Sequence, residues 1–125
     1  MEIPQEHQAV MPYLILNEAE KFMAFVQQVF DARQLICNKD ESQAIRHAEI
    51  QINGSTIMFA NSTETWAPQT AGLYIYVPNA DTSYRKALEN GAISIMEPAD
   101  QSYGRSSGVQ DPCGNVWWIT SALPK

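Results

Sequence analysis

The sequence predicts one α+β domain over residues 1–125, in which the same strand–helix–strand–hairpin unit occurs twice. The first observation behind this prediction is the order of elements, because each half of the chain gives the same succession of patterns. The second is the pair of hairpin glycines, Gly54 and Gly114, which fall at matching places in the two halves. The third is size, since 125 residues with 45% apolar content are enough for one domain with its own core.

The first repeat is expected over about residues 10–60. Asn17 is the expected N-cap of its helix, and the apolar residues that follow have the spacing of one helical face. Asn53 and Gly54 are typical of a two-residue hairpin turn, and the strand before them alternates polar and apolar side chains. The expected strands are 12–16, 35–37, 46–52 and 55–60, and the expected helix is 18–30.

The second repeat is expected over about residues 72–121, after a polar linker at 61–71. Asp111, Pro112 and Gly114 stand at the first, second and fourth positions of a turn, as the side-chain preferences of a type I turn require. This turn connects the two strands of the closing hairpin. The other expected elements are strands at 73–77 and 93–96 and a helix at about 80–90.

The two repeats, the Asp-Pro-x-Gly-Asn turn at residues 111–115 and the strand that carries Trp117 and Trp118 together resemble the vicinal oxygen chelate superfamily. This superfamily includes glyoxalase I, bleomycin-resistance proteins and extradiol dioxygenases. The resemblance covers about residues 10–121. It implies a mixed sheet that curls around a cavity, helices on the outer face of the sheet, and a homodimer.

Period-two alternation then divides the strand residues between the cavity and the helices. When the more apolar side of each strand is assigned to the helices, an aromatic and sulfur-rich set is left to line the cavity. Arg105, near a strand edge, is a candidate to hold a carboxylate or phosphate, and the alternative is that it only ties down the loop around it. The expected ligand-binding residues are Met11, Tyr13, Met58, Tyr74, Tyr76, Arg105 and Trp118.

A metal site of the kind found in this superfamily is not expected. The resemblance implies four ligand positions, and in this chain they fall on Met11, Met58, Gly72 and Trp118. Divalent metals in such sites are held by histidine nitrogens and carboxylate oxygens, which none of these residues supplies. We therefore expect no metal and no other cofactor.

Two residues remain as candidates for catalysis. His47 and Glu49 are two positions apart on one strand, so their side chains share a face. His47 could take a proton near neutral pH while Glu49 orients it. The simpler alternative is a solvated or hydrogen-bonded polar face without chemistry.

These features lead to the hypothesis of a metal-free small-molecule-binding protein, similar to bleomycin-resistance proteins, that takes an aromatic or cationic molecule in an aromatic-lined cavity. The alternative is an enzyme, either a glyoxalase-like lyase or isomerase or another member of the superfamily, that uses His47 and Glu49 with or without a metal. The sequence does not decide whether the protein is an enzyme.

The net charge of the chain disfavours some classes of binding partner. A formal net charge of −6 with scattered Lys and Arg residues is unfavourable for binding nucleic acid or an anionic membrane surface. Residues 1–10 contain no apolar run typical of a secretory signal. We therefore expect a cytoplasmic protein whose partners are a small molecule and a second copy of the chain.

Overall fold

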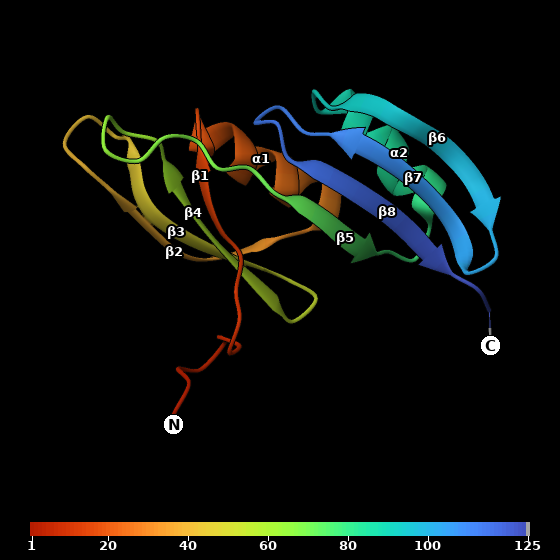
Figure 1. Ribbon diagram of the computed structural model, residues 1–125, viewed down its shortest axis with the longest axis horizontal. Helices are drawn as coiled ribbons and strands as arrows, with labels where there is room; N and C mark the ends of the chain where they lie inside the picture. Colours follow the sequence, from red (N-terminus) through yellow and green to blue (C-terminus); the bar gives the residue numbers. More distant parts are fainter. Residues whose placement is uncertain (125) are drawn as a thin grey trace. The chain divides into compact units, whose positions relative to one another are not determined.

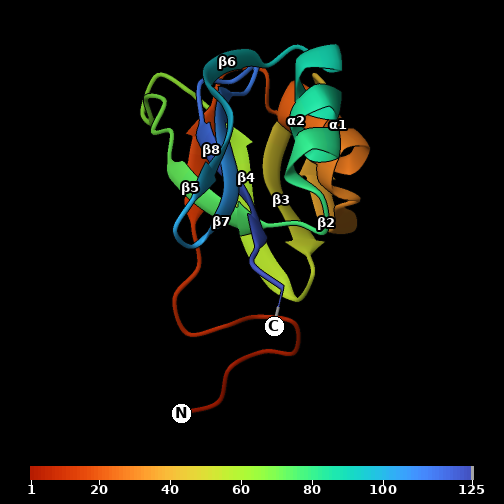
Figure 2. The same cartoon turned by 90° about the vertical axis from the view of Figure 1, so that its right-hand side faces the viewer.

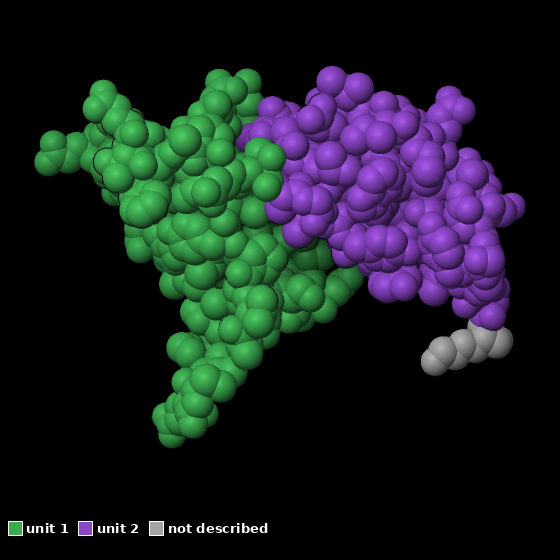
Figure 3. Space-filling model, viewed as in Figure 1, with its two compact units in different colours: residues 1–70 green, residues 71–125 purple. Residues whose placement is uncertain are grey.

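The computed structural model describes residues 1–124, and the chain divides into two compact units, residues 1–70 and 71–125 (Figures 1 and 3). Each unit contains one helix and one four-stranded mixed sheet. The α+β class and the two βαβββ repeats are therefore confirmed. No helix within residues 1–124 is both long enough and apolar enough to cross a lipid bilayer.

Unit 1 has a sheet of strand order β1-β4-β3-β2. Strand β1 runs parallel to β4, and the other neighbouring strands are antiparallel. Helix α1 packs against β3 and β4. The elements are β1 (Tyr13–Leu16), α1 (Ala19–Phe30), β2 (Arg33–Lys39), β3 (Ile45–Ile52) and β4 (Ser55–Asn61).

Unit 2 repeats this plan with a sheet of strand order β5-β8-β7-β6, in which β5 and β8 are parallel. Helix α2 contacts β6, β7 and β8 and lies along one side of this sheet (Figure 2). The elements are β5 (Gly72–Tyr76), α2 (Ala80–Glu89), β6 (Ile93–Gln101), β7 (Gly104–Gln110) and β8 (Val116–Ala122).

The core of unit 1 lies between α1 and the sheet, as the helical spacing of its apolar residues predicts. Phe22 meets Phe59 of β4 with ring centroids 4.8 Å apart at an angle of 65°, an edge-to-face geometry that aromatic pairs favour. Leu14 and Leu16 of β1 are buried, whereas Tyr13 is exposed. The alternation of buried and exposed side chains along β1 therefore follows the predicted faces.

At the start of both helices a backbone N–H donates a hydrogen bond to a side chain on the last strand of the same unit. In unit 1 the backbone N–H of Ala19 donates to Oδ1 of Asn61, at 2.7 Å. In unit 2 the N–H of Ala80 donates to Oγ of Ser121. The second helix also has the N-cap that its sequence favours, because the side chain of Asn79 accepts from the N–H of Thr82.

The prediction that Asn17 caps α1 was wrong. The N-cap residue is Glu18, which adopts a left-handed conformation with φ of 56° and makes no capping hydrogen bond with its side chain. Asn17 instead accepts a hydrogen bond from the hydroxyl of Ser62. The capping acceptor comes from Asn61, a residue 42 positions from Ala19 in the sequence, which local capping rules do not consider.

The closing hairpin of unit 2 is organised by Asp111. This buried carboxylate accepts hydrogen bonds from the backbone N–H groups of Cys113 and Asn115, from the side-chain amide of Asn115 and from the indole N–H of Trp117. These bonds hold the predicted turn and fix Trp117 in the core, where it is 2% exposed. Trp118, its neighbour, lies on the opposite face.

Two strands are longer than the sequence predicts. Strand β2 extends beyond 35–37, and β6 continues past 93–96 through Pro98. Both are edge strands, and the register of β6 shifts between Met96 and Ala99. A proline is tolerated at such an irregular edge because the strand needs no donor there.

Candidate functional site

The face of each sheet that lies opposite its helix is called here the open face of that unit. On the open face of unit 1, Met58 of β4 lies between Tyr13 of β1 and Glu49 of β3 in the strand register. Tyr13, His47 and Met58 on this face are half-buried or exposed, whereas the alternate residues Ala48, Ile50 and Phe59 are buried against α1. The residues predicted to face the helix are therefore buried, and Glu49, Thr56 and Ala60 on the open face are buried as well.

The polar residues of this face form a connected chain of hydrogen bonds. One carboxylate oxygen of Glu49 lies 2.7 Å from Nε2 of His7, and the other lies 2.8 Å from Nε2 of His47. The second ring nitrogen of His47, Nδ1, lies 3.2 Å from the hydroxyl of Tyr13. The two predicted catalytic candidates are therefore in contact, and Tyr13 is joined to them.

His7 belongs to this chain of hydrogen bonds, and the sequence analysis did not identify it. The segment around it is irregular but is tied to the start of β4 on both sides of the histidine. The carbonyl of Glu6 accepts from the Thr56 hydroxyl, and the side-chain amide of Gln8 donates to the Thr56 carbonyl at 2.9 Å. These partners lie 48 to 50 positions apart in the sequence, so no local pattern indicates them.

Glu49 is a buried carboxylate, 5% exposed. Burial alone raises the pKa of such a group because it disfavours the charged form. The hydrogen bonds from His47 and His7, together with their positive charge when protonated, outweigh that effect and lower the pKa of Glu49 below its ordinary value. The carboxylate is therefore ionised at neutral pH and acts only as an acceptor.

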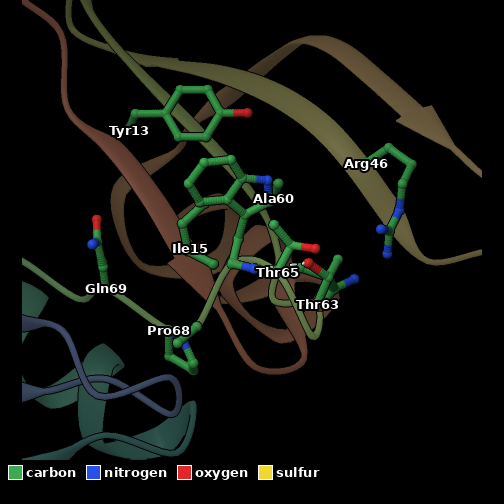
Figure 4. Close-up of a pocket in the computed structure, with 11 residues that line it drawn as sticks. Tyr13, Ile15, Arg46, Ala60, Thr63, Thr65, Pro68 and Gln69 are labelled. Atoms are coloured by element: carbon green, nitrogen blue, oxygen red, sulfur yellow. Dashed lines mark hydrogen bonds between the residues drawn. The ribbon is translucent and has the colours of Figure 1, made fainter.

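A pocket of about 880 Å³ lies on unit 1 next to this chain of hydrogen bonds, with Tyr13 part of both. Figure 4 shows Tyr13 at one end of the pocket, with its hydroxyl directed toward the strand that carries Arg46. Its walls come from β1, β3, β4 and the segment that follows β4. The lining residues are Tyr13, Ile15, Arg46, Ala60, Asn61, Thr63, Thr65, Trp66, Ala67, Pro68 and Gln69.

The segment that forms one wall of this pocket was predicted only as a linker. It is held in place by two backbone hydrogen bonds between Ile15 and Gln69 and by two hydrogen bonds between Thr63 and Trp66, one donated by each residue. Trp66 remains 66% exposed. A large aromatic residue in a polar, proline-containing stretch is the sequence signal that could have indicated a wall of a binding pocket.

Arg46 is the charged residue of the pocket lining, and its Nε lies 3.1 Å from a carboxylate oxygen of Asp40. A hydrogen bond from the Ser42 side chain is the main cause that lowers the pKa of Asp40, and Arg46 contributes to the same shift. The pair uses Nε, and the guanidinium of Arg46 carries further N–H donors on its other nitrogens.

The predicted aromatic residues of unit 2 lie together on its open face. Tyr74 pairs with Trp118 in the register of β5 and β8, and the rings of Tyr74 and Tyr76 are 5.3 Å apart. Both tyrosines are at least half exposed. Their contact with a ligand stays a prediction.

Arg105 lies apart from these aromatic residues. Its neighbour Ser106 bonds to Thr120 on the open face, so Arg105 points to the helix side, where its Nε lies 2.8 Å from Asp81 of α2. Asp100 accepts a second bond, and the two carboxylates raise the pKa of Arg105 above its ordinary value. This arrangement accounts for Arg105 as an ion-pair partner, and its contact with a ligand remains a prediction.

The side chains at the positions implied for metal ligands do not fit a metal. Met58 lies beside Tyr13, and Trp118 lies beside Tyr74. Met11 precedes β1, and Gly72 is paired with Val116. Two thioethers, an indole and a residue without a side chain offer neither imidazole nor carboxylate donors.

The two histidines and Glu49 are the other set that could be considered for a metal. Each histidine directs Nε2 at a carboxylate oxygen at hydrogen-bonding distance, so the donors face one another rather than a common point. Within residues 1–124, no group of three or more His, Cys, Asp or Glu side chains is placed to hold a metal ion.

Comparison with known proteins agrees with this architecture. The sequence profile of the family described as Glyoxalase/Bleomycin resistance protein/Dioxygenase superfamily matches residues 7–119. The chain is 27% identical over 121 residues to the uncharacterized protein Mb0911c of Mycobacterium bovis, a match that covers 87% of this chain and 80% of that protein.

Solved structures show the same fold at low sequence identity. TioX from Micromonospora sp. ML1 is 19% identical with a TM-score of 0.73, over 94% of this chain and 98% of that one. TnmS3, an antibiotic binding protein from Streptomyces sp. CB03234, is 18% identical with a TM-score of 0.71, over 94% and 100%. At such identities the likeness shows the fold alone.

Proposed function

Because this chain belongs to the glyoxalase, bleomycin resistance protein and dioxygenase superfamily, we propose that it is a metal-free protein that binds a small aromatic molecule. The proposed binding site is the pocket of unit 1. Tyr13, which the sequence indicated as a ligand-binding residue, is part of its lining.

The size and chemistry of this pocket carry the proposal. A volume of about 880 Å³ lies within the range of pockets that bind drug-sized molecules. Tyr13 and Trp66 offer ring faces, each of which contributes about 0.5 to 1.5 kcal/mol on stacking with an aromatic ligand. The hydroxyl and amide side chains of the lining would fix the orientation of the ligand.

An aromatic ligand fits this pocket better than a cationic one. The formal net charge of −6 attracts cations at long range, but this attraction is screened by salt. Arg46 lies in the pocket itself and repels a positive group at short range, an effect that Asp40 offsets only in part. A planar ligand with polar or acidic substituents avoids this repulsion.

The relatives are consistent with binding as a function. TnmS3, which shares the fold, is described as an antibiotic binding protein. A protein of this fold can therefore serve as a binder, although the fold does not choose the ligand. The homodimer and the cytoplasmic location that the sequence suggested remain predictions.

A second candidate is an enzyme of the glyoxalase kind, a lyase or isomerase. The observation that favours it is the contact of His47 with Glu49, which is typical of an oriented general base. Metal analysis of protein purified without a chelator separates the two functions. Stoichiometric transition metal would support the metal-dependent enzyme and contradict the proposal of a metal-free binder.

The binding function is tested with a panel of aromatic and cationic compounds, measured by thermal shift and tryptophan fluorescence. Several aromatic compounds should raise the melting temperature of the wild-type protein. Trp66→Ala should weaken their binding about tenfold, which corresponds to the loss of one well-placed ring contact. Tyr103→Ala, a change of an exposed aromatic residue in unit 2, is the matched control and should leave binding unchanged.

A further inference from the structure

We propose that Tyr13, His47 and Glu49 form a metal-independent proton-accepting centre beside the pocket of unit 1, which receives an acidic aromatic hydroxyl group of the ligand. The three side chains are joined by hydrogen bonds, and Tyr13 is also part of the pocket lining. The inference rests on the proposed function, because it assigns the chemical class of the molecule bound there.

The direction of the hydrogen bonds is fixed from Glu49 outward. An ionised carboxylate has no proton to donate, so both of its partners must be donors. Nε2 of His7 and Nε2 of His47 therefore each carry a proton and donate it to Glu49, at 2.7 and 2.8 Å. His7 holds Glu49 from the other side and acts as a positioning residue.

The position of the proton on His47 then determines whether the Tyr13 hydroxyl donates to His47 or accepts from it. A neutral imidazole has one N–H and one bare nitrogen, so a proton on Nε2 leaves Nδ1 as an acceptor. In this neutral ring the hydroxyl of Tyr13, 3.2 Å away, donates to Nδ1. The lone pairs of the Tyr13 oxygen are left as acceptors on a side chain that is 47% exposed.

A ligand hydroxyl that donates to Tyr13 completes a path for one proton. The hydroxyl of the ligand gives its proton to the Tyr13 oxygen, and the Tyr13 proton moves to Nδ1 of His47. The products are a ligand oxyanion, which accepts a hydrogen bond from Tyr13, and an imidazolium beside Glu49. Charge and atoms balance, because the ligand loses one proton and His47 gains one, while Tyr13 ends with the same number of protons. Glu49 stabilises the imidazolium that results.

A phenol is a suitable donor because its acidity is far greater than that of an aliphatic hydroxyl, and its ring can stack on the aromatic wall. Arg46 in the pocket lining adds a positive charge that favours an oxyanion over a neutral or cationic group. A hydrogen-bond chain with only a structural role would not need to end at a half-exposed hydroxyl in a pocket.

The test compares 4-nitrophenol with 4-nitroanisole, which has the same ring and no acidic hydroxyl. At a pH where 4-nitrophenol in solution is mostly neutral, the wild-type protein should convert it to the phenolate, seen as the longer-wavelength absorbance band. Tyr13→Phe and His47→Asn should reduce 4-nitrophenol affinity about tenfold or more and abolish the band. Tyr84→Phe, which changes a half-buried tyrosine of unit 2 that lies outside the pocket, should behave as wild type.

The outcomes separate this inference from the proposed function. If 4-nitroanisole binds but 4-nitrophenol stays neutral, or if Tyr13→Phe still forms phenolate, the proton-accepting centre is wrong and the binding function stands. If neither probe binds, both proposals fail for simple aromatic ligands. A 15N NMR measurement of His47 needs no ligand: a bare Nδ1 that shifts in Tyr13→Phe supports the centre, and a protonated Nδ1 in the neutral ring overturns it.

Discussion

The indole ring of Trp118 occupies the space that a side chain at Gly108 would need. These two residues face each other across β7 and β8, and a Cβ atom at Gly108 would lie 2.5 Å from Cζ3 of Trp118. A glycine at this position therefore allows the indole to lie close to the backbone on the open face of unit 2.

Gly108→Ala is expected to displace Trp118 and to lower the free energy of unfolding by about 1 to 3 kcal/mol, the usual cost of overpacking. Denaturant unfolding and the tryptophan emission spectrum measure the two effects. Gly72→Ala is the matched control, since a Cβ atom there meets nothing within 4 Å. Equal effects of the two substitutions would show that the close approach of Trp118 has no energetic weight.

Asp111→Ala is expected to destabilise the protein by about 3 kcal/mol, measured by denaturant unfolding. The substitution removes the acceptor of the buried Trp117 indole N–H and of the Asn115 amide, and lost acceptors of buried donors cost about 1 to 3 kcal/mol each. Asp100→Ala removes a largely exposed carboxylate of the same unit and should cost less than about 1 kcal/mol. A similar loss in both variants would contradict the assigned role of Asp111.

Glu49→Gln is expected to lower the free energy of unfolding by about 2 kcal/mol at neutral pH, because an amide cannot accept from both histidines as the carboxylate does. The pKa of Glu49 is lower in the folded protein than its ordinary value of 4.5. The stabilisation is therefore complete above about pH 4.5 and is lost as the pH falls through the folded-state pKa.

Unfolding of wild type and Glu49→Gln over a range of pH measures this difference directly. The two stabilities should converge at acidic pH, while Glu64→Gln, a change of an exposed residue, should follow wild type throughout. A gap between wild type and Glu49→Gln that widens on acidification would mean that the histidines do not stabilise the ionised carboxylate.

Asn61→Ala is expected to cost about 1 kcal/mol, the typical value of a lost helix cap, because the N–H of Ala19 then loses its acceptor. Circular dichroism during thermal unfolding gives the change in stability. Asn38→Ala on the edge strand β2 serves as the control and should have little effect. An unchanged Asn61→Ala variant would mean that α1 begins without help from β4.

The repeat and the strand faces could be predicted because the signals behind them are local. Alternation along β8 is enough to separate buried Trp117 from Trp118, and the turn chemistry around Asp111 is enough to place the hairpin between them. The same alternation placed Tyr13 and Glu49 on one face.

The rest of the candidate site depends on residues that are distant in the sequence. His7 reaches Glu49 across 42 positions, and the wall that contains Trp66 is fixed by the pairing of Gln69 with Ile15. No periodic pattern in the sequence indicates either contact. The segment that contains Trp66 was read as a linker because its composition is that of a loop, and composition does not reveal what a loop packs against.

The central claim is that the pocket of unit 1 binds an aromatic molecule without a metal. The most direct measurement is a two-dimensional 1H–15N NMR titration of chelator-treated protein with the aromatic panel. We expect the indole N–H of Trp66 and the amides of Tyr13 and Gln69 to shift together with rising ligand concentration. The claim is contradicted if these signals stay fixed, or if they respond only after a divalent metal is added.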